Sequence, residues 1–592
     1  MTLNILNKIN EPKDLKSLSR EELNLLSSEI RDVLIKRVST TGGHFGPNLG
    51  MVEATIALHY VFNSPVDKFV YDVSHQSYVH KMLTGRKEAY INPEKFKTVT
   101  GYTEPKESEH DFFTIGHTST SISLACGLAK GRDAVGSNEN IIAIIGDGSL
   151  SGGEAYEGLN NAAASNKNII ILVNDNDISI AENHGGLYKN LAQLRESEGK
   201  LDNNFFKSLG FEYHFVKDGN NLESLIETFE KVKDTTRPVV VHMHTIKGKG
   251  YEDAENNKES FHWVMPFDLE TKEPLFKGEY VKSYGDITED FLIEKAKKDK
   301  SIVAITAATP GIVGVNRFRS ELQDQYVDVG IAEEHAIALA SGMAKRGAKP
   351  VAAFLSSFIQ RTYDQLSQDL AINNNPATIM VYWGGISGSD VTHLGLFDIP
   401  LISNIPNMVY LAPTTKEEHL AMVDWAIEQD KHPVAIRVPN MEVVSTGVGV
   451  EANFDELNKY VMVEEGKDVA IIGLGSFFHL GKKVQKRLRN TGINATLINP
   501  RFITGVDEDL LNELKENHKV VITLEDGILD GGFGEKISRF YGNSQMRVLN
   551  FGATKEFTDS VELDVLYERY HLTEELIVED IEKVLADIKV FA

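Results

Sequence analysis

The stretch from Asn140 to Asn176, NIIAIIGDGSLSGGEAYEGLNNAAASNKNIIILVNDN, constrains the fold of this chain more than any other. It holds two short apolar runs rich in β-branched residues, Ile141–Ile145 and Ile169–Val173, which predict strands buried on both faces of a sheet. Ser149 and Ser151 are placed to cap a helix between them. The unit is therefore βαβ. Because its crossover is right-handed, we expect the two strands to lie side by side, with their carboxyl ends at one ligand-binding edge.

Polar turns follow both of these strands. Gly146-Asp147-Gly148 ends the first strand, and Asn174-Asp175-Asn176 ends the second. A carboxylate from Asp147 and an amide oxygen from Asn176 are hard ligands, which suit Mg²⁺ or Ca²⁺ and are poor for zinc. The glycines allow backbone to approach a ligand closely, and a helix N-terminus attracts anions. A G-D-G turn alone is a weak signal, but paired with N-D-N it predicts a cradle for a metal-bound diphosphate.

Composition limits the classes of function. A chain of 592 residues, of which 42% are hydrophobic and 25% are charged, predicts roughly three or four globular domains. The formal net charge of −25 argues against binding nucleic acid or an anionic membrane surface. The single cysteine, Cys126, lies in an apolar run and is expected to be a core residue. We find neither a transmembrane span nor a signal peptide and expect a cytoplasmic enzyme.

Three histidine-bearing loops precede the diphosphate motif. His44 lies at the centre of the glycine-rich loop Gly42–Gly50, His75 and His80 follow shortly after, and His117 lies in a turn of glycine and hydroxyl residues. One such histidine alone would be interpreted as an ordinary polar loop residue without a catalytic role. Three of them together predict the walls of a single pocket that handles protons and oxygen-rich groups.

The remainder of the first domain is less specific. Residues 1 to about 40 show helical spacing, whereas Glu182–Lys207 is polar and poorly periodic and is interpreted as a mobile connection, a linker rather than a lid. A strand leads into Lys247–Tyr251. Two interpretations of its lysines have about equal weight: they face phosphate, or they form an exposed basic turn. His262 follows, and the domain is expected to close near residue 290.

Residues 301 to about 450 repeat the α/β alternation. Strands are expected at Ile302–Ile305, Val351–Phe354, Thr378–Tyr382, Met408–Leu411 and Val434–Val438. Glu333 opens an alanine-rich helix, where an acid ordinarily compensates the helix dipole but could also reach a ligand's ring nitrogen. Arg361 opens another helical segment, and the glycine-rich loop Gly384–Gly395 carries Asp390 and His393.

A third unit follows a linker at about 445–465. Strands are expected at Val469–Ile472, Ala495–Ile498 and Val520–Leu524, with helices between them. Its turns Glu525–Gly527 and Gly531–Gly534 are either structural or part of an interface, and the sequence does not choose between these.

Several segments of the chain together resemble one family. They are the G-D-G to N-D-N unit, the Asp390 to His393 loop, and the stretches GGHFGPNLGMVEATIALH, YDVSHQSYVHKMLTGR, GHTSTSIS, DVGIAEEHA, QRTYDQ and TLEDGILDGGFG. That family is the 1-deoxy-D-xylulose-5-phosphate synthase family of the transketolase-like thiamine-diphosphate enzymes. The resemblance implies an α/β fold of three transketolase-like domains whose parallel sheets are flanked by helices. These are a diphosphate domain at 1–290, a pyrimidine-binding domain at 300–450 and a C-terminal domain at 465–592. It also implies a cofactor held between the first two domains and a homodimer.

The resemblance assigns roles by matched position. Asp147, Asn176 and the Ile178 carbonyl would hold Mg²⁺, and Glu333 would protonate the ring nitrogen of the aminopyrimidine, on which Phe358 would stack. The cofactor would be lined by His75, Gly116, His117, Thr118, Gly148, Ser149, Asn176, Lys247 and Tyr251. The catalytic set would be Glu333, His44, His393, Asp390 and Arg361, acting on pyruvate and an aldehyde.

Three positions depart from the family pattern. Leu355, Trp383 and Asn440 stand where the family has a tyrosine and two arginines, which weakens the expected pocket for the phosphate of glyceraldehyde 3-phosphate. The leading hypothesis is transfer of a two-carbon unit from pyruvate to glyceraldehyde 3-phosphate. The alternatives are a paralogue with a different, unphosphorylated aldehyde, and transketolase-type transfer from a ketose. A non-catalytic relative is disfavoured because Glu333, His44 and His393 are all present.

Overall fold

The computed structural model describes residues 3–165, 167–276, 278 and 281–591, which form two compact units. The first comprises Met1–Glu279 with Gly330–Ala332, and the second comprises Tyr280–Val329 and Glu333–Ala592. Within the described residues, no helix has the length and apolar character needed to cross a membrane.

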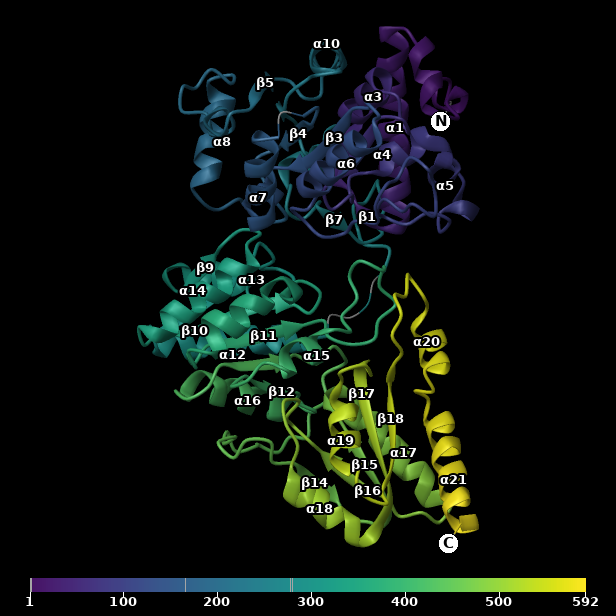
Figure 1. Ribbon diagram of the computed structural model, residues 1–592, viewed down its shortest axis with the longest axis vertical. Helices are drawn as coiled ribbons and strands as arrows, with labels where there is room; N and C mark the ends of the chain where they lie inside the picture. Colours follow the sequence, from purple (N-terminus) through teal and green to yellow (C-terminus); the bar gives the residue numbers. More distant parts are fainter. Residues whose placement is uncertain (1–2, 166, 277, 279–280, 592) are drawn as a thin grey trace. The chain divides into compact units, whose positions relative to one another are not determined.

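A five-stranded parallel sheet forms the centre of the first unit (Figure 1). Its strand order is β2 (Lys68–Tyr71), β3 (Ile141–Gly146), β4 (Ile170–Asp175), β6 (Val239–His244) and β5 (Glu212–Val216). The βαβ prediction is confirmed, since β3 and β4 are parallel neighbours joined by α7 (Gly153–Ala163). A second, antiparallel pair joins β1 (Gly43–His44) to β7 (Trp263–Val264).

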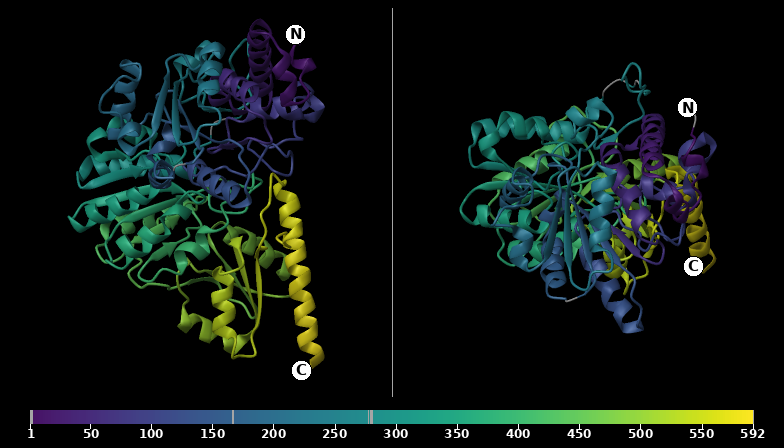
Figure 2. Two further views of the ribbon diagram at one scale, coloured as in Figure 1. Left: turned by 45° about the horizontal axis from the view of Figure 1, so that its top comes forward. Right: turned by 90° about the horizontal axis from the view of Figure 1, so that it is seen from above.

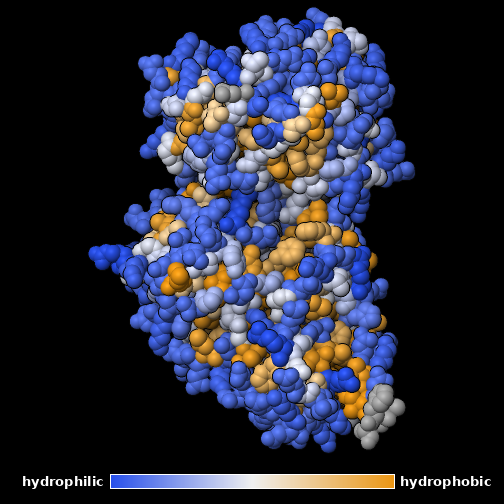
Figure 3. All heavy atoms as spheres, viewed as in Figure 1, coloured by the Kyte–Doolittle hydropathy of each residue, from blue (hydrophilic) through white to orange (hydrophobic). Residues whose placement is uncertain are grey.

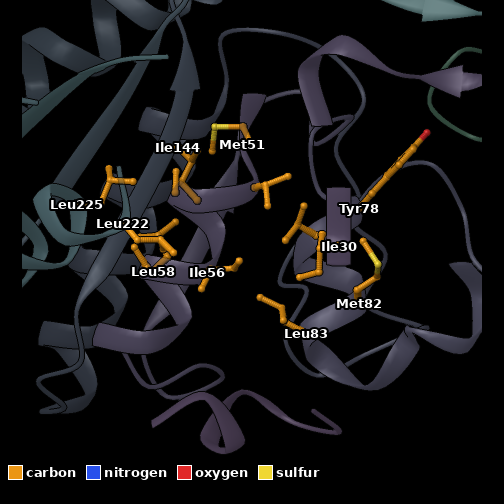
Figure 4. Packing of buried hydrophobic residues seen from close by; sticks show 14 of the residues in the cluster. Ile30, Met51, Ile56, Leu58, Tyr78, Met82, Leu83, Ile144, Leu222 and Leu225 are labelled. Carbon is orange, nitrogen blue, oxygen red and sulfur yellow. The ribbon is translucent and has the colours of Figure 1, made fainter. Parts of the chain in front are cut away.

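Both faces of this sheet are buried. Alternate residues of β3 face opposite ways, so that Ile142 and Ile144 pack into one hydrophobic cluster while Ala143 and Ile145 pack into another. Figure 4 shows part of the first cluster, where side chains of α3 (Val52–Val61) and α10 (Leu222–Val232) pack together. Burial on both faces explains why the strands read as continuous apolar runs.

The helices of the first unit differ from the sequence prediction at two places. The helix expected over residues 1–40 begins only at Arg20, where Ser19 and Glu22 form a capping box, and 3-10 turns precede it. The linker predicted at Glu182–Lys207 is wrong, because α8 forms there with Tyr188, Leu191 and Leu194 buried. The helices are α1 (Arg20–Thr41), α2 (Gly46–Gly50), α3, α4 (Tyr78–Lys81), α5 (Glu88–Ile91), α6 (Ser121–Val135), α7, α8 (Gly186–Glu196), α9 (Phe205–Leu209), α10 and α11 (Glu252–Asn256).

Two sheets form the second unit. The first is parallel, in the order β12 (Val409–Leu411), β13 (Val434–Arg437), β11 (Thr378–Tyr382), β10 (Lys349–Leu355), β8 (Ile302–Thr306) and β9 (Tyr326–Asp328). The second has the order β14 (Val461–Glu464), β16 (Thr496–Asn499), β15 (Asp468–Gly473), β17 (His518–Ile528) and β18 (Arg547–Ala553), with only β14 antiparallel. The expected strands of both sheets are confirmed to within a few residues.

The helices of the second unit cover these sheets. They are α12 (Tyr284–Lys298), α13 (Asn316–Glu321), α14 (Glu333–Lys345), α15 (Asp398–Ser403), α16 (Lys416–Glu428), α17 (Phe478–Asn490), α18 (Glu508–Asn517), α19 (Phe533–Tyr541), α20 (Leu563–Arg569) and α21 (Glu574–Phe591). The last helix packs against α17 beside the second sheet, as the left view of Figure 2 shows in yellow. The face drawn in Figure 3 is largely hydrophilic, with hydrophobic residues in separate groups.

A buried ion-pair network connects the two sheets of the second unit. Arg437, at the end of β13, is 6% exposed, and its Nε lies 2.6 Å from Asp398 Oδ2. Its Nη1 pairs with Asp526 of β17. Glu525 accepts hydrogen bonds from the backbone N–H groups of Phe533 and Gly534. Glu525 and Asp526, which were predicted to lie in a turn, instead belong to β17, and both have structural partners inside the unit.

Replacing Arg437 with alanine is expected to destabilise the protein strongly. The change leaves the Asp398 and Asp526 carboxylates buried without their cation, and breaking such a pair costs about 3–5 kcal/mol. Urea denaturation followed by circular dichroism measures this loss. Arg487→Ala is the matched control, because Arg487 pairs with Glu575 on the surface, where a pair contributes about 0–1 kcal/mol. Equal midpoints for the two variants would contradict the importance of the buried network.

Candidate active site

Two turns of the first unit meet at the carboxyl edge of its sheet. In the register of β3 and β4, Gly146 lies opposite Asn174. The backbone N–H of Asn176 donates to Asp147 Oδ1 across a distance of 3.5 Å. The turns that carry Asp147 and Asn176 therefore lie side by side at this edge of the sheet.

This pair of turns is buried and rich in acceptor oxygens. Asp147 is 1% exposed and Asn176 is 8% exposed. Among the described residues, no hydrogen-bond donor reaches Asn176 Oδ1. Burial, together with the nearby charge of Asp175, raises the pKa of Asp147 to about 7. A bound cation would give the orphaned amide oxygen a partner and favour the ionised carboxylate, so these residues fit a hard divalent metal.

The middle acid of the N-D-N turn has a different role. Both oxygens of the Asp175 carboxylate lie 2.8 Å from Arg195 Nη1, and Oδ2 also lies 2.8 Å from His242 Nε2. Hydrogen bonds from these partners hold the pKa of Asp175 below its usual range even though burial alone would raise it. Asp175 therefore has a structural role. The next residue, Asn176, contacts the turn of Asp147.

The glycine turn after β3 is shaped by close packing. Gly148–Ser151 forms a 3-10 turn, and a Cβ at Gly148 would lie 2.8 Å from the Ser179 side chain, so only glycine fits there. The expected capping by Ser149 and Ser151 is wrong. The N-cap of α7 is Gly152, which has no side chain to offer, and the Ser151 hydroxyl donates instead to the Gly148 carbonyl at 2.9 Å.

The loop that carries Gly116, His117 and Thr118 is fixed against this turn. The buried Asp72 carboxylate accepts the backbone N–H groups of Ser119 and Ser121 at 2.8 and 3.0 Å. The Ser119 hydroxyl donates to the Ser149 carbonyl at 2.8 Å. Asp72 was not among the predicted site residues, although an acid directly after a short buried strand is the same signal that identified Asp147.

Three histidines converge in the first unit, but only His44 and His75 come from the loops predicted to form a single pocket wall, and the third is His262. The prediction was wrong for His80, whose buried ring hydrogen-bonds to His59 and Asp111 instead. The pairing of β1 with β7 brings His44 beside the segment that carries His262. The ring centroids of His44 and His75 are 4.8 Å apart, those of His44 and His262 are 5.7 Å apart, and those of His75 and His262 are 5.2 Å apart. His75, a predicted site residue, therefore lies next to His262, which was not among the predicted site residues.

Lys247 is part of this cluster and does not form an exposed basic turn. It is 2% exposed, and its Nζ donates to the Ser179 carbonyl at 2.7 Å and to His262 Nδ1 at 3.0 Å. Burial lowers the pKa of Lys247 to about 7.

The segment after β6 lies beside the Asn174–Asn176 turn. Ile178 lines a cavity of about 360 Å³ together with Glu255–Ser260. Lys258 Nζ donates to the Asn176 carbonyl at 3.0 Å and was not identified from the sequence. The Tyr251 ring packs against Phe45, with centroids 5.2 Å apart, and no described residue hydrogen-bonds its buried hydroxyl.

The second unit places its candidate residues at the carboxyl ends of its parallel strands. Glu333 begins α14 and is 4% exposed, and its Oε2 lies 3.6 Å from Arg361 Nη1. Burial raises the pKa of Glu333 despite the opposing charge of Arg361. The result is a buried carboxyl that keeps its proton to higher pH than an exposed glutamic acid does.

Phe358 and the Asp390 to His393 loop lie close to each other in the same unit. β10 and β11 are parallel neighbours, and the segments that follow them carry Phe358 and this loop. The Phe358 and His393 ring centroids are 5.7 Å apart, and His393 Nδ1 lies 3.2 Å from Asp390 Oδ1. Burial alone would raise the pKa of Asp390, but hydrogen bonds from His393 and Thr392 lower it overall.

The three positions that depart from the family pattern have different environments. Leu355 is 3% exposed and belongs to the hydrophobic core beside β10. Trp383 is 55% exposed and has a φ of +57°, in the left-handed region that is rare for a bulky residue. Asn440 is exposed.

Sequence models of known families match most of the chain. The 1-deoxy-D-xylulose-5-phosphate synthase model matches residues 6–202 and 198–245. The transketolase pyrimidine-binding domain matches residues 282–444, and the transketolase C-terminal domain matches residues 458–577.

Curated relatives are similar over nearly their full length. A protein of Halothermothrix orenii named 1-deoxy-D-xylulose-5-phosphate synthase is 39% identical, with 97% of this chain and 96% of that protein covered. One of the same name from Natranaerobius thermophilus is 40% identical, with 90% of each covered. A solved transketolase from Pichia stipitis is 16% identical with a TM-score of 0.45, covering 95% of this chain and 97% of that one. This chain belongs to the 1-deoxy-D-xylulose-5-phosphate synthase family of transketolase-like, thiamine-diphosphate-dependent transferases.

Proposed function

We propose that this protein transfers the two-carbon unit of pyruvate to glyceraldehyde 3-phosphate, with loss of CO₂, using thiamine diphosphate and Mg²⁺. Membership of the family supports the reaction. The observation that carries the cofactor assignment is the pair of turns at Asp147 and Asn176, with a buried carboxylate beside an amide oxygen that has no donor among the described residues. When bound, thiamine diphosphate supplies a carbon nucleophile and accepts the negative charge left by decarboxylation.

In the first unit, Asp147, Asn176 and the Ile178 carbonyl would hold Mg²⁺. Gly116, His117, Thr118, Gly148 and Ser149 would surround the diphosphate, because their loops are tied together through Ser119 and Asp72. His75, Lys247 and Tyr251 would complete the lining. His44 would handle protons of the substrates, since its ring lies within the cluster of His75 and His262.

In the second unit, Glu333 would exchange a proton with the ring nitrogen of the aminopyrimidine, on which Phe358 would stack. Its buried carboxyl suits this task because burial raises its pKa above the ordinary value for glutamic acid, while the nearby charge of Arg361 limits the cost of ionisation. His393 would act as a base toward a substrate hydroxyl. Its Nδ1 lies 3.2 Å from Asp390 Oδ1, an arrangement in which the carboxylate orients the imidazole ring and stabilises its protonated form.

We further propose the three-domain division at residue ranges 1–290, 300–450 and 465–592, a homodimer, and a cytoplasmic location, on the strength of the family resemblance. Light scattering during size-exclusion chromatography tests the dimer. A mass of one chain, 65.8 kDa, at micromolar protein concentration would contradict it.

Product identification tests the reaction. The protein is incubated with pyruvate, glyceraldehyde 3-phosphate, thiamine diphosphate and Mg²⁺, and the products are analysed by mass spectrometry. We expect 1-deoxy-D-xylulose 5-phosphate together with CO₂. Product formation from xylulose 5-phosphate in place of pyruvate, without CO₂, would instead indicate ketol transfer.

Trp383 is the observation that favours testing a second acceptor, an unphosphorylated aldehyde. Its indole is exposed at the end of β11, in the unit that carries Arg361 and His393, and an indole offers no charge to a phosphate. Steady-state kinetics with a panel of aldehydes separates the two acceptors. Saturation by glyceraldehyde 3-phosphate at micromolar concentration would exclude an unphosphorylated acceptor as the main substrate.

A further inference from the structure

One segment of the first unit holds both turns of the proposed metal site. Asn183 Nδ2 donates to Asp147 Oδ2 at 2.7 Å. The Tyr188 hydroxyl lies 3.2 Å from the Asp147 carbonyl oxygen and 3.1 Å from that of Gly148. Arg195 binds the Asp175 carboxylate through Nη1. The three side chains come from α8 and the loop before it, which we call the 183–195 segment.

The contact from Asn183 fixes the direction of the Asp147 carboxylate. Oδ2 is occupied by the Asn183 amide, so Oδ1 is the oxygen that points toward the backbone N–H of Asn176. This N–H is 3.5 Å away and holds the oxygen only weakly. Oδ1 thus remains available for a cation, and the neighbouring Asn176 carries a buried amide oxygen that has no donor among the described residues.

The rest of the segment makes this contact rigid. Tyr188 is 9% exposed and packs with Leu191 and Leu194 in the core beside β3 and β4. Arg195 has a side chain that is 13% exposed, and it holds Asp175 from the other end of α8. Because α8 is ordered and contacts both turns, holding Asn183 in one orientation costs less conformational entropy than it would in a free loop.

We propose that Asn183 is a positioning residue for the metal ligand Asp147, held in place by Tyr188 and Arg195. This inference rests on the proposed function, because it assumes Mg²⁺ at the Asp147 turn. It extends that function to a side chain outside the G-D-G and N-D-N motifs. Groups that hydrogen-bond to metal ligands typically change metal affinity 10–100-fold when they are removed.

Titration calorimetry of Mg²⁺ into the full-length protein with saturating thiamine diphosphate tests the proposal. For Asn183→Ala we expect Mg²⁺ affinity to fall by about 10–100-fold. Asn183→Leu, which keeps the size of the side chain and removes the donor, should fall equally. The matched control is Asn190→Ala, because Asn190 lies on α8 but hydrogen-bonds to Asn203 and Phe205 rather than to either turn. Its affinity should be unchanged.

Hydrogen exchange gives a second measurement that does not depend on turnover. Mg²⁺ with thiamine diphosphate should slow amide exchange across the 183–195 segment in the wild type and slow it less in Asn183→Ala. Wild-type affinity in both Asn183 variants would overturn the inference while leaving the proposed function intact. Failure of the wild type itself to take up Mg²⁺ and thiamine diphosphate would instead overturn the proposed function.

Discussion

Replacing Glu333 with glutamine is expected to lower turnover by about 10²–10⁴-fold, the range that a positioned proton-transfer group contributes. Glutamine keeps the shape of the side chain at the start of α14 but cannot take up or release the proton. Glu333 is 4% exposed, and its Oε2 lies 3.6 Å from Arg361 Nη1. Burial beside one cation is typical of carboxyl groups whose pKa is shifted for proton transfer. Steady-state kinetics with pyruvate and glyceraldehyde 3-phosphate measures the loss.

The variant must still bind the cofactor for this result to count. We expect Glu333→Gln to take up thiamine diphosphate, since the metal ligands lie in the other unit of the chain. Glu334→Gln is the matched control on the same turn of the helix, and it should keep wild-type turnover. Undiminished turnover in Glu333→Gln would contradict the assigned role and would revive the hypothesis of a non-catalytic relative.

Replacing Asp147 with asparagine is expected to weaken Mg²⁺ binding by more than about 100-fold, because a direct ligand contributes more than the outer groups whose loss costs 10–100-fold. The variant keeps the side-chain shape and removes the only charged ligand of the proposed set. Uptake of thiamine diphosphate should fall with it. Calorimetric titration of Mg²⁺ in the presence of the cofactor gives the affinity.

The control for Asp147→Asn is Asp133→Asn. Asp133 lies on α6 of the same unit and pairs with Arg132 and Lys167 at 2.9 and 2.6 Å. Arg132 contacts the residues just before β3 and β4, so this pair lies at the opposite ends of the strands from Asp147. The Asp133→Asn variant should bind Mg²⁺ as the wild type does. Equal Mg²⁺ affinity in Asp147→Asn and the wild type would show that the metal is held elsewhere.

The central strands were predictable because their physical signal is local. Ile141–Ile145 reads as a strand from five consecutive apolar residues, and the parallel pairing of β3 with β4 then follows from the handedness of the crossover. The short edge strand β9 (Tyr326–Asp328) and the partly exposed β14 (Val461–Glu464) have no comparable run, because an edge strand buries less of its surface. The sequence therefore predicted the sheet centres better than their edges.

The 183–195 segment shows where prediction from sequence fell short. Leu187, Leu191 and Leu194 have helical spacing, but the glycines and polar residues around them suggested a linker. Its contacts were not predictable at all, since Asn183 reaches Asp147 across 36 residues of sequence. Motif spacing identified the residues that meet at the strand ends, whereas the residues that orient them depend on tertiary packing.

The proposed function requires the turns at Asp147 and Asn176 to bind thiamine diphosphate through Mg²⁺. Calorimetric titration of thiamine diphosphate into the wild-type protein, once with Mg²⁺ and once with EDTA, tests this requirement most directly. We predict saturable uptake of one cofactor per chain with Mg²⁺ and little or none with EDTA. Absence of uptake in the presence of Mg²⁺, or equal uptake in both buffers, would contradict this mode of cofactor binding.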